Sequence, residues 1–182
     1  FEIIIIDDGS TDNGFEIVSL FSDNRIKLFQ QENKGAAAAR NLGIENATGE
    51  LITFLDADDF WFPNHLEEIF KLYTDYPNCG IYTNRYFIKI SNKKIIKPSY
   101  LPEVQNNFKG VLFDYFTASK TYRVGLTSAI AIPKSILQND FIFNSEISSG
   151  QDLELYTKIA IEKPVAINNL FTVEYNFSLD NQ

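Results

Sequence analysis

The sequence is poor in the residues that several common kinds of site require. It has one cysteine, Cys79, and one histidine, His65, among 182 residues. A disulfide framework needs cysteine pairs, a zinc site needs several Cys or His ligands, and Ser-His-Asp or Cys-His hydrolases need a histidine beside their nucleophile. These classes lack their parts. We expect Cys79 to be a small core residue and His65 to lie on the surface.

Positive charge and long apolar runs are also scarce. The 24 Asp and Glu residues outnumber the 16 Lys and Arg residues, which gives a formal net charge of -8. Affinity for nucleic acid is built largely from clustered Lys and Arg, so we expect no nucleic-acid partner. No apolar run approaches the roughly 18 to 20 residues that cross a bilayer. No predicted strand is followed by the G-x-G-x-x-G pattern of dinucleotide-binding oxidoreductases.

Strand and helix signals alternate through the first half of the chain. Apolar and β-branched runs predict strands at residues 3–6, 25–29, 51–55, 80–90 (one or two strands) and 128–132, with short strands around Val165 and Thr172. Spacing, composition and proline positions predict helices at 15–21, 36–46 and 63–76, and helices beginning at Pro133 and at 150–152. This alternation is typical of an α/β domain with a mainly parallel sheet.

Two further local features follow from the same pattern. In the helix predicted at 63–76, one face carries Leu66, Ile69, Phe70 and Tyr73. Residues 92–107 contain two prolines and several asparagines, which predicts a long mobile connection between two halves of one domain.

Two of the predicted strands end in acids: Asp7-Asp8-Gly9-Ser10-Thr11-Asp12 after the first, and Asp56-Ala57-Asp58-Asp59 after the third. In open α/β sheets, ligands bind outside the carboxyl ends of the strands. Taken alone, the first cluster can be a strand-to-helix turn, because Asp, Gly, Ser and Thr supply turn geometry and helix caps. In the second cluster, two carboxylates about 4 Å apart repel by roughly 4 kcal/mol at an effective dielectric of about 20. A divalent cation, Mg²⁺ or Mn²⁺, would neutralise them, and a solvated acidic loop is the alternative.

The order and spacing of several short motifs resemble those of the family-2 glycosyltransferases. The motifs are the two acidic clusters, Asn33-Lys34-Gly35 followed by Ala39-Arg40-Asn41, Thr48-Gly49-Glu50, and Pro63 behind the second cluster. The resemblance implies one α/β domain over residues 1–182 with the GT-A (Rossmann-like) fold, a mixed, mainly parallel sheet flanked by helices. It also implies a nucleotide-sugar-binding half at 1–90 and an acceptor-binding half at 91–182.

The resemblance implies a role for each matching residue of the donor site. Asp8 resembles the family's nucleobase-binding acid, and its carboxylate can accept a hydrogen bond from the N3–H of uracil. Asp56 and Asp58 resemble the DxD motif, which holds Mn²⁺ or Mg²⁺ against the donor diphosphate, so Asp56 also counts as nucleotide-binding. Gly35 and Arg40 resemble part of the donor-side wall. For Arg40, pairing with phosphate and an ordinary place on a helix surface are both open.

A catalytic base is implied late in the domain. Asp152, in Ser149-Gly150-Gln151-Asp152-Leu153-Glu154, matches the family's Asp at a helix start, although Gln151 stands where the family usually has Glu. The alternative is an acid favoured in the first turn by the helix dipole.

The family's first strand and the helix after it are absent before Phe1, and the chain contains no methionine. A strand-helix-strand unit needs about 30 residues or more. We therefore expect the natural protein to begin upstream of Phe1.

The resemblance implies an inverting glycosyltransferase of bacterial polysaccharide biosynthesis. The expected donor is a UDP-sugar, and the acceptor is a hydroxyl of a saccharide or lipid-linked glycan. The expected location is the cytoplasm, with peripheral association at the inner face of the membrane as an open alternative. Two other interpretations stay open: a phosphoreceiver-type signalling domain, which also places acids and Mg²⁺ after parallel strands, and an inactive relative that binds sugar nucleotides.

Overall fold

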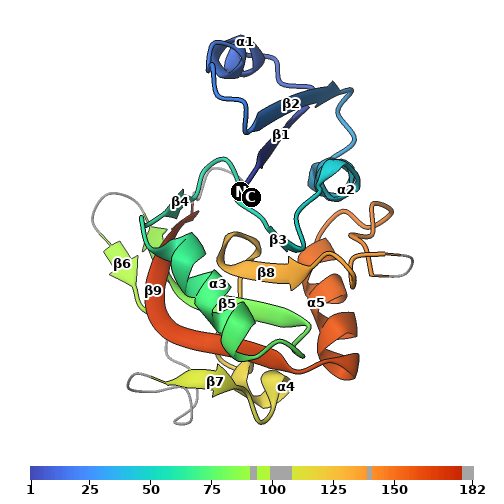
Figure 1. Cartoon of the computed structure of the whole chain (residues 1–182). Coiled ribbons are helices and arrows are strands. Elements are labelled where there is room, and N and C mark those ends of the chain that lie inside the picture. The colour runs from blue at the N-terminus through green and yellow to red at the C-terminus, as the bar shows by residue number, and fades with distance from the viewer. Residues whose placement is uncertain (91–93, 99–107, 139–140, 178–182) are drawn as a thin grey trace. The chain divides into compact units, whose positions relative to one another are not determined.

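The computed structural model describes residues 1–90, 94–98, 108–138 and 141–177 (Figure 1). The chain divides into two compact units. Unit 1 comprises Phe1–Ile52 and Pro133–Lys158, and unit 2 comprises Thr53–Ile132 and Ile159–Gln182. The chain passes from one unit to the other within strand β3 (Leu51–Thr53), near the end of strand β8 (Ile130–Pro133) and within helix α5 (Gln151–Glu162).

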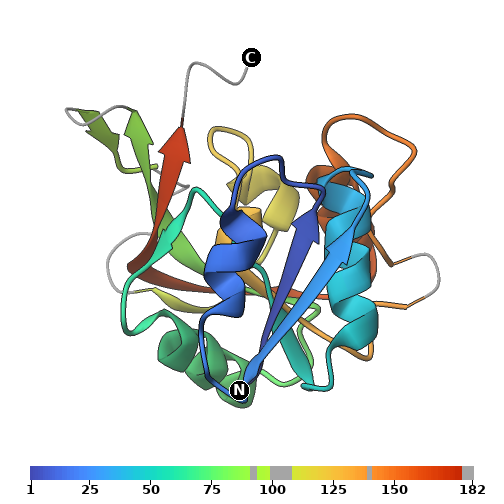
Figure 2. The same ribbon diagram turned by 90° about the horizontal axis from the view of Figure 1, so that it is seen from above.

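Unit 1 contains a pair of parallel strands, β1 (Ile3–Asp8) and β2 (Ile26–Gln31), which run side by side in Figure 2. Helix α1 (Gly14–Ser19) lies between them in the chain, and helix α2 (Ala36–Asn46) follows β2 and packs along β1. The register pairs the last residue of β1, Asp8, with the last residue of β2, Gln31. Both strands therefore deliver their carboxyl ends to the same edge of this sheet.

Strand β1 is only partly buried. Ile3 is 39% exposed, and Ile4, Ile5 and Ile6 are only half-buried. Within the described part of unit 1, β1 pairs with β2 alone, and α2 packs along it. A branched apolar run therefore forms the strand here without being enclosed on both faces.

Unit 2 contains a mixed sheet whose long central strands, β5 (Ile81–Ile90) and β9 (Val165–Phe177), are parallel. Shorter strands pair antiparallel with them. Strands β8 and β6 (Lys94–Ile96) pair with β5. Strands β4 (Phe60–Trp61) and β7 (Lys109–Val111) pair with β9. Helix α4 (Tyr115–Ala118) follows β7, and a short 3-10 turn, η3 (Thr127–Ala129), precedes β8. The sheet is mixed, as the resemblance implies.

The two strands predicted around Val165 and Thr172 are one continuous strand. The register of β9 against β5 shifts between the pairs Asn84–Asn168 and Arg85–Phe171. The polar Asn168-Asn169 step that interrupts the apolar pattern is thus an irregularity inside the strand. A sequence break of this kind marks a bulge as readily as a strand end.

Helix α3 (His65–Asp75) covers one face of the β5–β9 pair (Figure 1). The predicted apolar face is partly wrong, since Leu66 is 37% exposed and Phe70 is 59% exposed, whereas Ile69 and Leu72 are buried. The buried side chains of α3 are His65, Ile69 and Leu72, which follow one another at spacings of four and three residues and so share one face of the helix.

The prediction that His65 lies on the surface is wrong. The residue is 1% exposed, its Nδ1 lies 2.8 Å from the hydroxyl of Thr172 on β9, and its ring stacks on Trp61 with 4.5 Å between centroids. Burial lowers the pKa of His65 to about 4. Cys79, in contrast, is 4% exposed, which confirms its prediction as a core residue.

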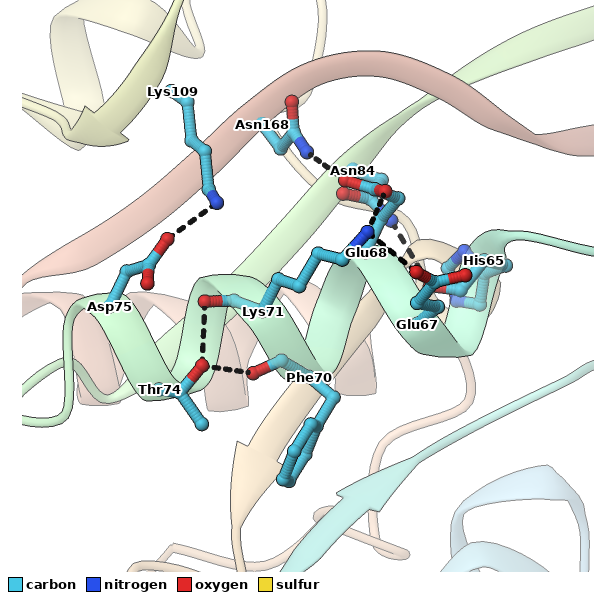
Figure 3. Close-up of polar contacts among 10 residues, drawn as sticks. All are labelled: His65, Glu67, Glu68, Phe70, Lys71, Thr74, Asp75, Asn84, Lys109 and Asn168. Atoms are coloured by element: carbon cyan, nitrogen blue, oxygen red, sulfur yellow. Dashed lines mark hydrogen bonds and ion pairs between the residues drawn. The ribbon is translucent and has the colours of Figure 1, made fainter.

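Polar contacts join α3 to the neighbouring strands β9 and β7 (Figure 3). Glu68 accepts hydrogen bonds from Lys71 (3.0 Å) and from the side-chain amide of Asn168 on β9 (3.1 Å). At the end of the helix, Asp75 pairs with Lys109 on β7 at 2.5 Å. These contacts fix the position of α3 on unit 2.

Two other predictions differ from the structure. Pro133 ends strand β8, and the residues after it form turns with hydrogen bonds from Ile136 N to Pro133 O and from Leu137 N to Lys134 O, not the predicted helix. Most of the connection predicted at 92–107 lies outside the described residues, and its part at Lys94–Ile96 is strand β6. The predicted helix at 36–46 and the helix starting at Gln151 are both present.

Candidate active site

Asp8, the last residue of β1, is held by three N–H donors from the end of β2 and the segment that follows it. Its Oδ1 accepts hydrogen bonds from the Gln31 side chain (2.6 Å) and from the backbone N–H of Lys34 (2.9 Å), and its Oδ2 accepts one from the backbone N–H of Gly35 (2.8 Å). An ionised carboxylate offers about four lone-pair sites. These three donors use three of the four, and a ligand can bind the remaining site on Oδ2.

Two glycines allow the chain to form this arrangement. Gly9 has φ +73°, and a Cβ there would lie 2.7 Å from the backbone nitrogen of Asn33. Gly35 has φ +85° and stands at the N-cap of α2. Both conformations favour glycine, and the close approach at Gly9 admits no side chain. The structure therefore brings Asp8 and Gly35, two predicted nucleotide-binding residues, into direct contact.

The other two acids of the first cluster shape the turn. Asp7 is 9% exposed and accepts hydrogen bonds from Ser10 N (3.0 Å) and from the Gln30 side chain (2.8 Å). These hydrogen bonds, those from Ser10 first, lower the pKa of Asp7 below its ordinary value. Asp12 accepts a hydrogen bond from Gly14 N at the start of α1 (2.9 Å). Turn formation accounts for Asp7 and Asp12, as the simpler interpretation of this cluster predicts.

Arg40 lies on α2, and its guanidinium sits over the ring of Phe143, 5.4 Å from the ring centroid. The next residue, Asn41, binds both backbone groups of Phe143, donating to its carbonyl oxygen (2.8 Å) and accepting from its N–H (3.0 Å). Arg40 is thus placed beside a buried aromatic side chain. Its predicted contact with the donor stays a prediction.

Asp152 is the second residue of α5 and is half-buried. Gly150, just before the helix, has φ +80°, and the Gln151 side chain donates a hydrogen bond back to the carbonyl oxygen of Ile147 (2.9 Å). The structure thus places Asp152 in the first turn of a helix, where the sequence predicts it. Asp8, Gly35, Arg40 and Asp152 belong to unit 1, whereas Asp56 and Asp58 belong to unit 2.

In unit 2, Asp56–Asp59 forms a turn that follows β3, closed by a hydrogen bond from Asp59 N to Asp56 O (3.0 Å). We call these four residues the acid loop. Asp56 is half-buried and Asp58 is exposed. Burial raises the pKa of Asp59 to about 6, and the charges of Asp58 and Asp56 add to that rise, while hydrogen bonds from Ser128 and Asn176 oppose it.

The acid loop suits a divalent cation. Among the residues that the structure describes, no group of three or more His, Cys, Asp and Glu side chains is arranged to hold a metal. Mg²⁺, however, is usually held by one or two carboxylates, with substrate phosphates and water completing its shell. Asp59 already accepts from the Ser128 hydroxyl through Oδ2 (2.5 Å) and from Asn176 N through Oδ1 (3.0 Å). Asp56 and Asp58 carry carboxylates of the kind that such an ion binds, and their place in the metal site stays a prediction.

Sequence reasoning missed Ser128 and Asn176. Ser128 is fully buried in η3, some seventy positions after the acid loop, and Asn176 lies near the end of β9. Nothing in the residue types around them indicates a contact with Asp59, because both contacts depend on how η3 and β9 are placed by the fold.

Comparisons with known proteins agree with these observations. The model of glycosyl transferase family 2 matches residues 1–133. The chain belongs to this family. An uncharacterized glycosyltransferase of Rickettsia felis is 35% identical over 170 residues, which cover 91% of this chain and 26% of that relative. Membership in family 2 rules out the phosphoreceiver interpretation.

Solved structures show the fold of this family-2 chain. Crystal structures of TarS 1-349 from S. aureus, in complex with UDP and with UDP-GlcNAc, match with a TM-score of 0.77 and 20% identity. Each match covers 98% of this chain and 52% or 50% of the TarS chain. The predicted α/β GT-A fold is confirmed.

The family-2 chain is shorter than its relatives. It spans about a quarter of the length of the glycosyltransferases of Rickettsia felis and Rickettsia conorii. No helix in the described part of the chain is both long enough and apolar enough to span a bilayer. The predicted division near residue 90 into donor and acceptor halves, and the roles of the individual site residues, stay predictions.

Proposed function

We propose that this chain is the catalytic domain of an inverting glycosyltransferase that uses a UDP-sugar. The observation that carries the proposal is the Asp8 carboxylate, fixed at the end of β1 by Gln31, Lys34 and Gly35, with an acceptor site remaining on Oδ2. Uracil presents an N3–H donor that such an acceptor can bind. The TarS complexes with UDP and UDP-GlcNAc support this choice of donor class.

Asp56 and Asp58 would hold Mn²⁺ or Mg²⁺. When bound, the ion supplies Lewis-acid stabilisation of the negative charge that develops on the departing diphosphate. Asp59 is held by Ser128 and Asn176 through hydrogen bonds to both of its oxygens.

Asp152 acts as the general base in this proposal. Its carboxylate takes the proton from an acceptor hydroxyl while that oxygen forms a bond to the anomeric carbon and the bond to the nucleoside diphosphate breaks. Attack from the face opposite the leaving group inverts the anomeric configuration. We propose a saccharide or lipid-linked glycan as the acceptor.

A thermal unfolding experiment with UDP and Mn²⁺ tests the donor assignment. A ligand at about a hundred times its dissociation constant stabilises the folded state by about 2.7 kcal/mol, which raises the melting temperature of a domain of this size by several degrees. We expect this shift with UDP and Mn²⁺ together, and a smaller one when EDTA replaces Mn²⁺. No shift with UDP would contradict the proposal.

A turnover assay separates an active enzyme from an inactive relative. Both bind UDP and Mn²⁺, but only an active enzyme releases UDP from a UDP-sugar in the presence of an acceptor hydroxyl. UDP binding without sugar transfer to any of a panel of saccharide and lipid-linked acceptors would favour the inactive relative.

A further inference from the structure

Ser128 joins the two ends of the acid loop. Its side chain is fully buried, and its Oγ accepts a hydrogen bond from the backbone N–H of Asp56 (3.1 Å) while donating one to Oδ2 of Asp59 (2.5 Å). A hydroxyl has one hydrogen and two lone pairs, so both bonds can be made at once. One side chain thereby sets the distance between the first and last residues of the loop.

Asn176 holds the acid loop from β9. Its backbone N–H donates to Oδ1 of Asp59 (3.0 Å), and its side-chain amide donates to the backbone carbonyl oxygen of Asp58. Ser128 and Asn176 together therefore bind all three acids of the loop. Ser128 binds the backbone of Asp56, Asn176 binds the backbone of Asp58, and both bind the side chain of Asp59.

Ser128 is itself fixed by the core of unit 2. Its carbonyl oxygen accepts a hydrogen bond from the indole N–H of Trp61 (2.5 Å), and Trp61 stacks on the buried ring of His65. His65 in turn contacts the hydroxyl of Thr172. The hydroxyl that binds the acid loop is therefore attached to a packed aromatic cluster and not to a surface segment.

We propose that Ser128 and Asn176 are positioning residues that hold the acid loop in the shape that binds the divalent cation. The inference rests on the proposed role of Asp56 and Asp58 as metal ligands. Carboxylates that lie close together repel one another, so a loop without these attachments would relax away from the metal-binding arrangement. Restoring that arrangement on binding would then reduce the affinity for the ion.

The test measures binding of Mn²⁺ in the presence of UDP, by electron paramagnetic resonance of the free ion, for the wild-type chain and two variants. Ser128→Ala removes the hydroxyl that holds the loop. Tyr82→Phe is the matched control, because it also removes the hydroxyl of a fully buried residue of unit 2, and that hydroxyl bonds to the backbone of Tyr76 and Cys79, not to the loop or to the cluster around Ser128. We expect Ser128→Ala to weaken Mn²⁺ binding about 10- to 100-fold, the usual effect of losing an outer-shell partner. Tyr82→Phe should bind Mn²⁺ like the wild type at a comparable loss of melting temperature.

Asn176→Ala provides a second variant that keeps the fold. It removes the bond to the Asp58 carbonyl and leaves the backbone bond to Asp59 in place. We expect weaker Mn²⁺ binding, and in turnover a higher Mn²⁺ concentration for half-maximal rate with kcat restored at saturating Mn²⁺.

The outcomes separate the two proposals. If the wild-type chain binds no Mn²⁺ with UDP, the proposed function is wrong and the inference falls with it. If the wild type binds Mn²⁺ and either variant, Ser128→Ala or Asn176→Ala, binds it with wild-type affinity, the proposed function stands and the positioning role of that residue is overturned.

Discussion

Asp8 ends strand β1 and the acid loop follows strand β3, but the surroundings of their carboxylates differ. At the end of β1, three N–H groups converge on one carboxylate, that of Asp8. In the acid loop, Ser128 and Asn176 supply two donors to the carboxylate of Asp59, while Asp56 and Asp58 add their charges beside it. The first site is rich in donors and the second is rich in negative charge.

This difference in donors matches the two ligands expected at these sites. A carboxylate whose orientation is set by neighbouring N–H groups is a fixed acceptor, suited to a neutral donor such as the N3–H of uracil. A loop with surplus negative charge is suited to a divalent cation, which supplies the compensating charge. The two sites should therefore respond differently when a carboxylate is replaced by its uncharged amide.

The largest expected effect comes from an acid that belongs to neither site. Asp152→Asn should lower kcat by about 10²- to 10⁴-fold, the contribution of a general base, while UDP and Mn²⁺ bind as in the wild type. Steady-state turnover and a UDP thermal shift, measured on the same preparation, check both parts. Near-normal turnover in Asp152→Asn would remove this residue from the mechanism.

Acid pH tests unit 2, which holds the chain's single histidine. Because burial lowers the pKa of His65 from 6.5 to about 4, the unfolded state binds a proton more readily, and stability present above pH 6.5 is lost as the pH falls toward 4. The full loss is about 3 kcal/mol, taking 1.36 kcal/mol for each pH unit of difference.

Denaturant unfolding at several pH values, for the wild type and for His65→Asn, isolates this contribution. The raised pKa of Asp59 changes stability in the opposite direction over an overlapping pH range, but it is common to both proteins and cancels in their difference. We expect the stability advantage of the wild type over His65→Asn to shrink by about 3 kcal/mol between pH 7 and pH 4. An advantage that does not change with pH would contradict the buried neutral state of His65.

Asp58→Asn tests the acid loop directly. Because Asp58 is exposed and its charge is repelled by its neighbours, its loss should change the free energy of unfolding by less than about 0.5 kcal/mol without metal. UDP affinity in the presence of Mn²⁺ should fall at least about tenfold, equivalent to ~1.4 kcal/mol. Titration calorimetry with UDP, with Mn²⁺ and with EDTA, checks this. The wild type in EDTA should resemble the variant.

Asp8→Asn should destabilise the fold by about 1–2 kcal/mol, since an amide cannot accept from all three N–H donors. If the oxygen of the new amide accepts from Gln31 and Lys34, its NH₂ group points at the N–H of Gly35 and at the N3–H of uracil. A donor then faces two other donors, so neither hydrogen bond can form. Asp12→Asn is the matched control, because its amide oxygen can still accept from Gly14 N. Equal losses of stability in Asp8→Asn and Asp58→Asn would contradict the inferred difference between the two sites.

Parts of the chain with a strong local signal were predictable from sequence. Helix α2 has the predicted bounds because its alanine run favours helix and Gly35 precedes it. The strand preceding Asp8 was predictable because four isoleucines favour extended backbone. The bulge in β9 and the turns after Pro133 were not, because a polar step or a proline marks an interruption without saying whether the strand resumes or a helix begins.

Sequence alone determined the family and the α/β class, and it placed Asp8, Asp56, Asp58 and Asp152 at element ends, because these features lie in short segments whose residues are neighbours in the chain. Only the tertiary structure decided that Gln31, Lys34 and Gly35 converge on Asp8, that Ser128 and Asn176 hold the acid loop, and that His65 is buried. Each of these results depends on segments that are distant in the chain and meet only when the strands pair. Hydrogen-bond partners and burial are properties of that meeting, and no local pattern of residues specifies them.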